Sequence, residues 1–106
     1  MKIPDNLITE INSIVDLFNS ETYKENEAEF IPVVKGGFLY LNREENGYIE
    51  KVVRLKYTGD MKNWEFAIYR FSTESYDDYD IFFPGDEYID GTIEGAMKAG
   101  DEAYPI

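Results

Sequence analysis

Three turn signals divide the middle of the chain into four short apolar-rich runs. The signals are Gly36-Gly37, Asn46-Gly47 and the segment 58–63, and the runs extend from Phe30 to Phe71. Glycine and asparagine tolerate the left-handed backbone conformation that tight hairpins require, and apolar runs between such turns are typical of antiparallel strands. The pattern therefore predicts an antiparallel meander.

The turns also predict which residues pair across each hairpin. A two-residue turn at Asn46-Gly47 pairs Glu45 with Tyr48, Arg43 with Glu50, Leu41 with Val52, Tyr40 with Val53 and Phe38 with Leu55. The next hairpin pairs Tyr57 with Trp64, Leu55 with Phe66, Val53 with Ile68 and Lys56 with Glu65. Both registers match opposite charges and apolar residues, which stabilises cross-strand neighbours.

Side chains alternate between the two faces of a strand, so these registers assign two faces. One face would hold Phe38, Tyr40, Val53, Leu55, Tyr57, Trp64, Phe66 and Ile68, with Ile31 and Val33 if the first strand pairs through Gly36-Gly37. We expect the N-terminal helix to pack there. The other face would hold Leu39, Leu41, Val52, Arg54, Lys56, Glu65, Ala67, Tyr69 and Phe71. Because half of it is apolar, it should be covered by the C-terminal segment, a second copy or a ligand.

Two helices flank the predicted strands. Apolar residues recur at helical spacing from about Asp5 to Asn19, and Pro4 suits the start of a helix. A shorter helix is expected from about Gly91 to Ala99, with Asp90 as its N-cap and Gly100 as its stop. Its small residues Gly95, Ala96 and Ala99 would allow close approach to a sheet or a partner.

Between the last run and the second helix, residues 72–80 read as an acidic loop and residues 81–83 as a short strand or a packed apolar anchor. We find no internal repeat and no domain boundary. The fold class predicted is α+β, a single domain over residues 1–106 with an N-terminal helix, an antiparallel four- to five-stranded meander sheet and a short C-terminal helix.

The chain of 106 residues contains no cysteine and no histidine. It therefore lacks zinc-thiolate sites, disulfides, cysteine nucleophiles and the commonest general base and metal ligand. Two carboxylates can act as acid and base, but no spacing here enforces that geometry. We expect no catalytic residues, no cofactor and no enzymatic activity. The sequence shows neither a signal-peptide pattern nor an apolar run of membrane-spanning length, so we expect a cytoplasmic location without membrane contact.

The net charge of −12 is concentrated at one end of the chain. Residues 74–106 carry ten carboxylates and one lysine, for a net charge of −9. Such a charge disfavours contact with nucleic-acid phosphates and anionic lipid, since both depend on Lys and Arg.

A partial calcium-loop pattern lies within this acidic block. If Asp86 took position 1 of an EF-hand loop, Asp90, Gly91 and Glu94 would fall at expected positions. However, Tyr88 would occupy position 3 and Met97 the position of the bidentate Glu. An acidic cap followed by a helix is the preferred interpretation, and no metal ligands are assigned.

Two groups of residues are candidates for contact with a partner. Asp77, Asp78 and Asp80 alternate with Tyr76 and Tyr79 in a run that could chelate a cation, imitate phosphates, or simply form an acidic surface loop. On the sheet, the cations Lys51, Arg54, Lys56 and Arg70 could hold an anion, or could balance nearby carboxylates. The residues singled out for interaction are Tyr76, Asp77, Asp78, Tyr79, Asp80, Arg54, Lys56 and Tyr69.

Five blocks in the second half of the chain carry a family resemblance. They are residues 54–59 (RLKYTG), 64–69 (WEFAIY), 82–85 (FFPG), 90–96 (DGTIEGA) and 103–105 (AYP). In this order they resemble a family of small prokaryotic proteins of unknown function. The resemblance covers about half the chain and implies that the C-terminal half is a structural unit that includes residues 90–96.

Two functions are compatible with these features. The first is a small interaction module that uses the acidic, Tyr-rich C-terminal segment to bind a protein partner or a second copy. The second is an acidic phosphate mimic that inhibits a basic nucleic-acid-binding protein. A divalent-metal site built from carboxylates is a third alternative.

Overall fold

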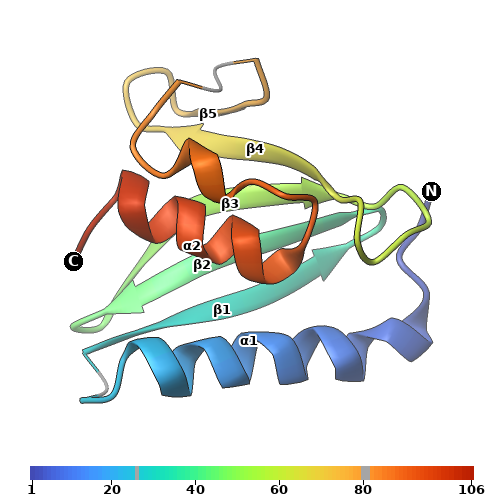
Figure 1. Cartoon of the computed structure of the whole chain (residues 1–106), viewed down its shortest axis with the longest axis horizontal. Helices are drawn as coiled ribbons and strands as arrows, with labels where there is room; N and C mark the ends of the chain where they lie inside the picture. The colour runs from blue at the N-terminus through green and yellow to red at the C-terminus, as the bar shows by residue number, and fades with distance from the viewer. Residues whose placement is uncertain (26, 80–81) are drawn as a thin grey trace.

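The protein is a two-layer α+β structure, in which a five-stranded antiparallel sheet carries two helices on one face (Figure 1). The computed structural model describes residues 1–25, 27–79 and 82–106. The strands follow chain order, as the meander prediction requires. The elements are η1 (Asp5–Leu7), α1 (Ile8–Thr22), β1 (Ala28–Lys35), β2 (Phe38–Glu45), β3 (Tyr48–Lys56), β4 (Glu65–Arg70), β5 (Ser75–Asp77), η2 (Asp86–Tyr88) and α2 (Ile93–Ala103).

The hairpin turns lie where the sequence predicts them. Asn46 and Gly47 both have positive φ, 53° and 85°, as a tight two-residue turn requires. Beyond the second hairpin, the register of β3 and β4 pairs Lys56 with Glu65, Leu55 with Phe66 and Val53 with Ile68, as predicted. The predicted β3–β4 hairpin is thereby confirmed.

The predicted register of β2 and β3 is correct only near the turn. Asn42 pairs with Lys51, but Leu41 pairs with Val53, because Val52 is an extra residue in β3 that forms a bulge. The predicted pairs beyond the bulge are wrong and are replaced by Leu41 with Val53, Tyr40 with Arg54 and Phe38 with Lys56.

This one-residue shift reverses the face assignment of β2. Leu39 and Leu41 face the helices and are fully buried, while Phe38 and Tyr40 lie on the opposite face. The bulge lets Val52 and Val53 both approach α2, where a Cβ built on Gly100 would lie 2.8 Å and 3.0 Å from their methyl groups. Burial of two adjacent valines stabilises the bulged register over the regular one.

Both helices differ from their predicted limits. Residues 5–7 are a 3-10 turn, and α1 then continues to Thr22 rather than ending at Asn19. In α2 the N-cap is Thr92, whose Oγ1 accepts a hydrogen bond from the Gly95 amide at 3.0 Å, so the assignment of Asp90 as N-cap is wrong. Gly100 lies inside α2 because its packing against β3 outweighs its weak helix propensity.

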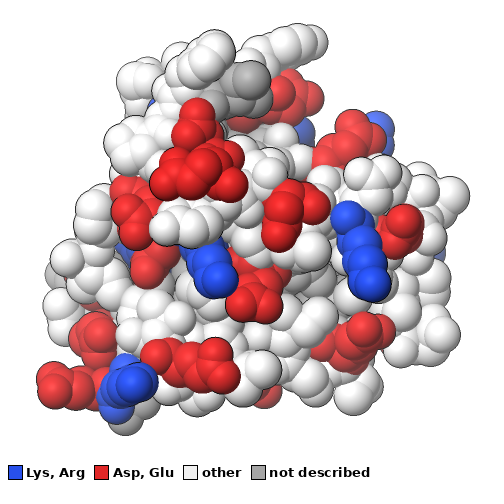
Figure 2. All heavy atoms as spheres, viewed as in Figure 1, with Lys and Arg blue, Asp and Glu red and all other residues white. Residues whose placement is uncertain are grey.

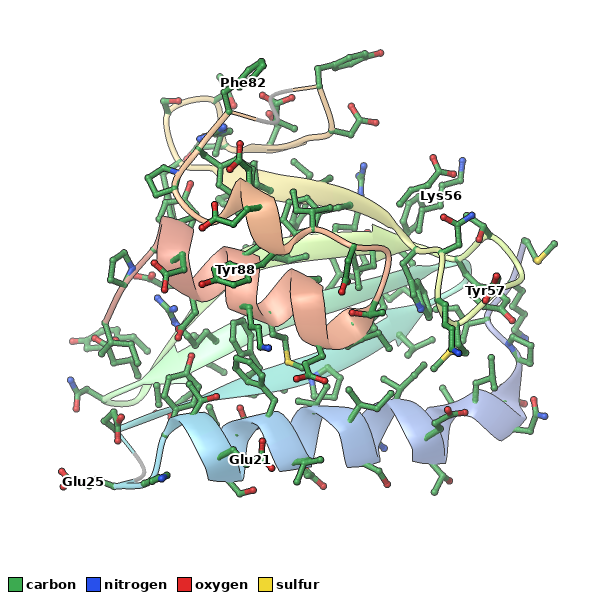
Figure 3. The ribbon with its side chains drawn as sticks, viewed as in Figure 1. Glu21, Glu25, Lys56, Tyr57, Phe82 and Tyr88 are labelled. Carbon is green, nitrogen blue, oxygen red and sulfur yellow. The ribbon has the colours of Figure 1, made fainter. Side chains whose placement is uncertain are left out.

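The segment between β4 and α2 contains a strand that the sequence analysis placed in a loop. Ser75–Asp77 forms β5 and pairs with the last three residues of β4. Phe83 is buried and stacks on Phe66 with ring centroids 5.9 Å apart, whereas Phe82 is exposed (Figure 3). Of the two structures predicted for residues 81–83, a short strand or a packed apolar anchor, the anchor is found at Phe83, while Ile81 lies outside the described residues.

The outer edge of β1 is protected against pairing with another strand. The side chain of Asn19 in α1 accepts a hydrogen bond from the Phe30 amide at 2.8 Å and donates one to the Phe30 carbonyl at 3.0 Å. Two residues further along, Pro32 has no amide hydrogen to offer. The edge is thus blunted in the way that natural sheets avoid edge-to-edge aggregation. Across the described ranges, no helix combines the length and apolar character needed to cross a membrane.

Candidate interaction surface on the open sheet face

The sheet face opposite the helices, here called the open face, has an unusual composition. Both α1 and α2 lie on the same side of the sheet (Figure 1), so the expectation that the C-terminal segment covers the second face is wrong for α2. Register and alternation assign aromatic and charged side chains to this face. They are Glu29, Lys35, Phe38, Tyr40, Glu44, Lys51, Arg54, Lys56, Glu65, Tyr69 and Tyr76, with Ile31, Val33, Asn42, Ile49 and Ala67 between them.

Arg54 occupies the centre of the open face between two aromatic rings. Its guanidinium carbon lies 4.8 Å from the ring centroid of Phe38 and 5.2 Å from that of Tyr76. In the described parts of the chain, it makes no ion pair with a carboxylate. The rings hold the guanidinium in place and leave its donor groups available for an anion.

The ring of Tyr76 reaches inward from the edge strand β5. Its centroid lies 5.1 Å from that of Tyr69 and 5.6 Å from that of Tyr40, so it spans from β4 to β2. Ala67, the register partner of Arg54, has a small side chain that leaves room for this ring. Desolvation, followed by the neighbouring Tyr40 and Tyr69, raises the pKa of Tyr76 to about 12. Its hydroxyl has no hydrogen-bond partner among the described residues.

Two lysines of the open face also lie over aromatic rings, as Arg54 does. Lys35 Nζ lies 5.9 Å from the Tyr40 centroid, and Lys51 Nζ lies 5.5 Å from the Tyr69 centroid. With Arg54 and Lys56, they place four of the chain's ten basic residues on the open face. Figure 2 shows the opposite, helix-bearing side, where carboxylates predominate over Lys and Arg. These four cations share the open face with the carboxylates Glu29, Glu44 and Glu65, so this face is close to neutral although the chain carries a net charge of −12.

A hollow of about 440 Å³ lies beside β4 where the open face meets the edge of the sheet. The open face contributes Phe38, Arg54 and Lys56, β4 contributes residues 65–67, and the end of β5 contributes Asp77 with Asp78. Ile89 closes the helix side. The hollow thus combines an apolar wall with Arg54, which makes no ion pair in the described parts of the chain, and this combination suits an amphipathic ligand.

The structure brings together some of the predicted interaction residues and separates others. Arg54, Tyr69 and Tyr76 share the open face, and Lys56 lines the hollow beside it together with Asp77 and Asp78. Tyr79 is 92% exposed and belongs to neither, while Asp80 lies outside the described residues. The predicted basic cluster is divided, because Arg70 stands over Phe83 on the other side of the sheet.

Sequence reasoning missed Lys35, Phe38 and Tyr40 as members of this surface. It assigned Phe38 and Tyr40 to the helix-covered core because the bulge at Val52 was not recognised. The available signal was the adjacent pair Val52-Val53, which allows either valine to face the core.

The residues of the partial calcium-loop pattern have structural roles instead. Met97 is fully buried in the core. Asp90 Oδ1 accepts hydrogen bonds from the Thr92 hydroxyl at 2.6 Å and the Thr92 amide at 3.0 Å. The hydroxyl bond is the main reason that the pKa of Asp90 is lowered. In the described residues, no three metal-ligating side chains are grouped.

Comparison of the chain with protein-family models, with curated proteins and with solved structures found no match. The family resemblance of residues 54–105 thus stays an expectation.

Proposed function

We propose that this protein is a small cytoplasmic binding module whose open face binds a protein partner that presents carboxylates. The observation that carries the proposal is Arg54, whose charge lies between Phe38 and Tyr76 and makes no ion pair with a carboxylate in the described residues. Charged groups that fold stability requires are usually paired, whereas unpaired, preoriented arginines are typical of recognition sites. The contact surface proposed here is thus the open face of the sheet rather than the acidic loop at residues 72–80.

The overall negative charge does not oppose such a contact. Charges interact over a Debye length of about 8 Å at physiological salt, so a partner at the open face responds mainly to the local cations. The acidic helix side would repel the same partner and thereby orient its approach (Figure 2).

Nucleic acid is a poorer fit for this face, although aromatic residues and cations are common to both kinds of site. Proteins that bind single strands stack bases on free aromatic faces. Here Arg54, Lys35 and Lys51 already lie over Phe38, Tyr40, Tyr69 and Tyr76. The aromatic rings therefore position the cations, and the cations would bind the carboxylates of the partner.

Affinity capture with matched variants tests the proposal. Immobilised wild-type protein, Arg54→Gln and Lys24→Gln would be exposed to a cell lysate, and retained proteins identified. Lys24 lies in an exposed turn after α1, so its variant changes net charge equally without touching the open face. A partner retained by wild type and Lys24→Gln but lost from Arg54→Gln supports the proposal. Equal retention by all three contradicts it.

The acidic phosphate mimic is a second candidate, and the carboxylate-rich helix side in Figure 2 favours it. A mimic would bind through that side, so its partner would be indifferent to Arg54→Gln. It would also dissociate steeply with added salt. The same capture experiment at low and high salt therefore distinguishes the two functions.

A further inference from the structure

Strand β4 is only half covered by its outer neighbour. β5 pairs Asp77 with Ile68 and Ser75 with Arg70, and no described residue of β5 stands opposite residues 65–67. At its other end, the Trp64 amide donates a hydrogen bond to the Gly91 carbonyl at 2.8 Å. Between these two points, about 10 Å of sheet edge has no strand beside it among the described residues, at a rise of about 3.3 Å per residue.

The backbone of Phe66 is directed toward this open edge. In antiparallel sheets, consecutive residues direct their N–H and C=O groups to opposite neighbours. Since the Trp64 amide points away from β3, the amide and carbonyl of Phe66 point the same way. They meet the hollow that residues 65–67 line. The edge thus offers one donor and one acceptor to an added strand.

β5 itself does not continue into this space. Asp77 Oδ1 accepts a hydrogen bond from the Tyr79 amide at 2.9 Å, which closes a turn and ends the strand. The open stretch of β4 is therefore collinear with β5 beyond that turn. Figure 3 shows Lys56 at this end of the sheet, well away from Phe82.

The two walls of the hollow specify the side chains of an added strand. A residue opposite Ala67 would point to the open face, where Arg54 is the register partner of Ala67. A residue opposite Phe66 would point to the other side, where Ile89 and the Phe66 ring are apolar. Among the charged groups of the hollow, Asp77 pairs with Arg70 at 3.9 Å, and Lys56 lies opposite Glu65. Asp78 also lines the hollow, and no ion pair joins it to Arg54 in the described residues. Arg54 is thus the cation that would bind a carboxylate of the added strand.

We infer that residues 65–67 of β4 receive a short extended segment of a partner protein, which adds a strand in line with β5 and places an acidic side chain against Arg54 and an apolar one against Phe66 and Ile89. The inference rests on the proposed function and names the form of its partner. Main-chain hydrogen bonds to Phe66 would supply affinity, and the two walls would supply specificity.

A phage library of random hexapeptides, selected against the full chain, provides the probe. Enriched peptides should contain Asp or Glu next to an apolar residue. A selected peptide, titrated onto isotope-labelled protein, should slow hydrogen exchange of the Phe66 amide about tenfold or more, while the Glu65 and Ala67 amides, which point toward β3, change little. The Arg54→Gln variant should weaken this peptide about tenfold, the effect of one charge-assisted hydrogen bond, and Lys24→Gln should leave it unchanged.

Three results would contradict the inference, and they differ in whether the proposed function also fails. If the peptide loses affinity in Arg54→Gln but leaves Phe66 exchange unchanged, strand addition fails and the open face stands. If no hexapeptide is enriched while a lysate protein still depends on Arg54, only the extended-segment partner fails. If single-stranded oligonucleotides bind and peptides do not, the inference and the proposed function both fail.

Discussion

Arg43 and Asp101 form an ion pair between β2 and α2, with 2.9 Å between Arg43 Nη1 and Asp101 Oδ1. The hydroxyl of Tyr23, at the end of α1, donates to the same oxygen at 2.5 Å. Burial and this hydrogen bond raise the pKa of Tyr23. One carboxylate oxygen therefore connects the sheet to both helices on the covered face.

Removal of this carboxylate should destabilise the fold strongly. Arg43 is almost fully buried, so Asp101→Ala leaves a buried charge without its partner, which costs about 3 kcal/mol. Urea unfolding measures the loss. The neighbouring exposed carboxylate provides a control, because Glu102→Ala should stay within about 0.5 kcal/mol of wild type. Equal effects of the two substitutions would contradict the role assigned to Asp101.

Gly100→Ala should also be destabilising, although alanine is the better helix former. The added Cβ would lie 2.8 Å from Val52 Cγ1, so α2 must move away from the bulge, at a cost of about 1–3 kcal/mol. Thermal unfolding, compared with the exposed helix variant Lys98→Ala, tests this expectation. A more stable Gly100→Ala variant would show that the helix and the bulge are not in close contact.

The Asn19 cap on the β1 edge should protect the protein against self-association. Asn19→Ala leaves the Phe30 amide and carbonyl without their side-chain partner and should cost about 1–3 kcal/mol. It also exposes a strand edge, so the variant should form larger species on light scattering. Asn12→Ala, an exposed position on the same helix, should remain like wild type in both assays. A monomeric, fully stable Asn19→Ala variant would refute the capping role.

Tyr76→Phe should be neutral or up to about 1 kcal/mol stabilising at neutral pH, because it removes a buried hydroxyl that has no partner among the described residues. The raised pKa predicts a pH effect of definite sign. Folding favours the protonated phenol of Tyr76. Its contribution to the free energy of unfolding is therefore fully present below pH 10.0 and is lost as the pH rises toward about 12. Between pH 10.0 and about 12, the free energy of unfolding should fall more steeply for wild type than for Tyr76→Phe. Parallel curves would contradict the buried position of this ring.

The sequence predicted those parts of the fold that local chemistry determines. The Asn46-Gly47 turn, the β3–β4 register and the first helix follow from turn residues and from apolar spacing. The faces of β2 could not be predicted, since a single inserted residue at Val52 reverses them and either adjacent valine satisfies the pattern. For the same reason, Phe38 and Tyr40 were not predicted to lie on the open face.

The candidate site was predicted only in part for a related reason. Arg54, Tyr69 and Tyr76 were selected from composition, but their grouping depends on Tyr76 reaching across Ala67 to Arg54. The strand β5, which carries Tyr76, has only three residues and lies within an acidic stretch that resembles a loop. Its position is set by pairing with β4, a tertiary interaction that local propensity does not encode.

If the open face contacts a carboxylate-bearing partner through Arg54, an acidic peptide should bind there. This can be measured by NMR at low salt, with blocked hexaglutamate titrated onto the isotope-labelled 106-residue chain. We expect the Arg54 side-chain Nε–H resonance to shift first and the amides of Phe38 and Tyr76 to follow, and we expect Arg54→Gln to abolish these changes. Shifts confined to α1 and α2, or changes that survive in Arg54→Gln, would contradict binding at the open face through Arg54.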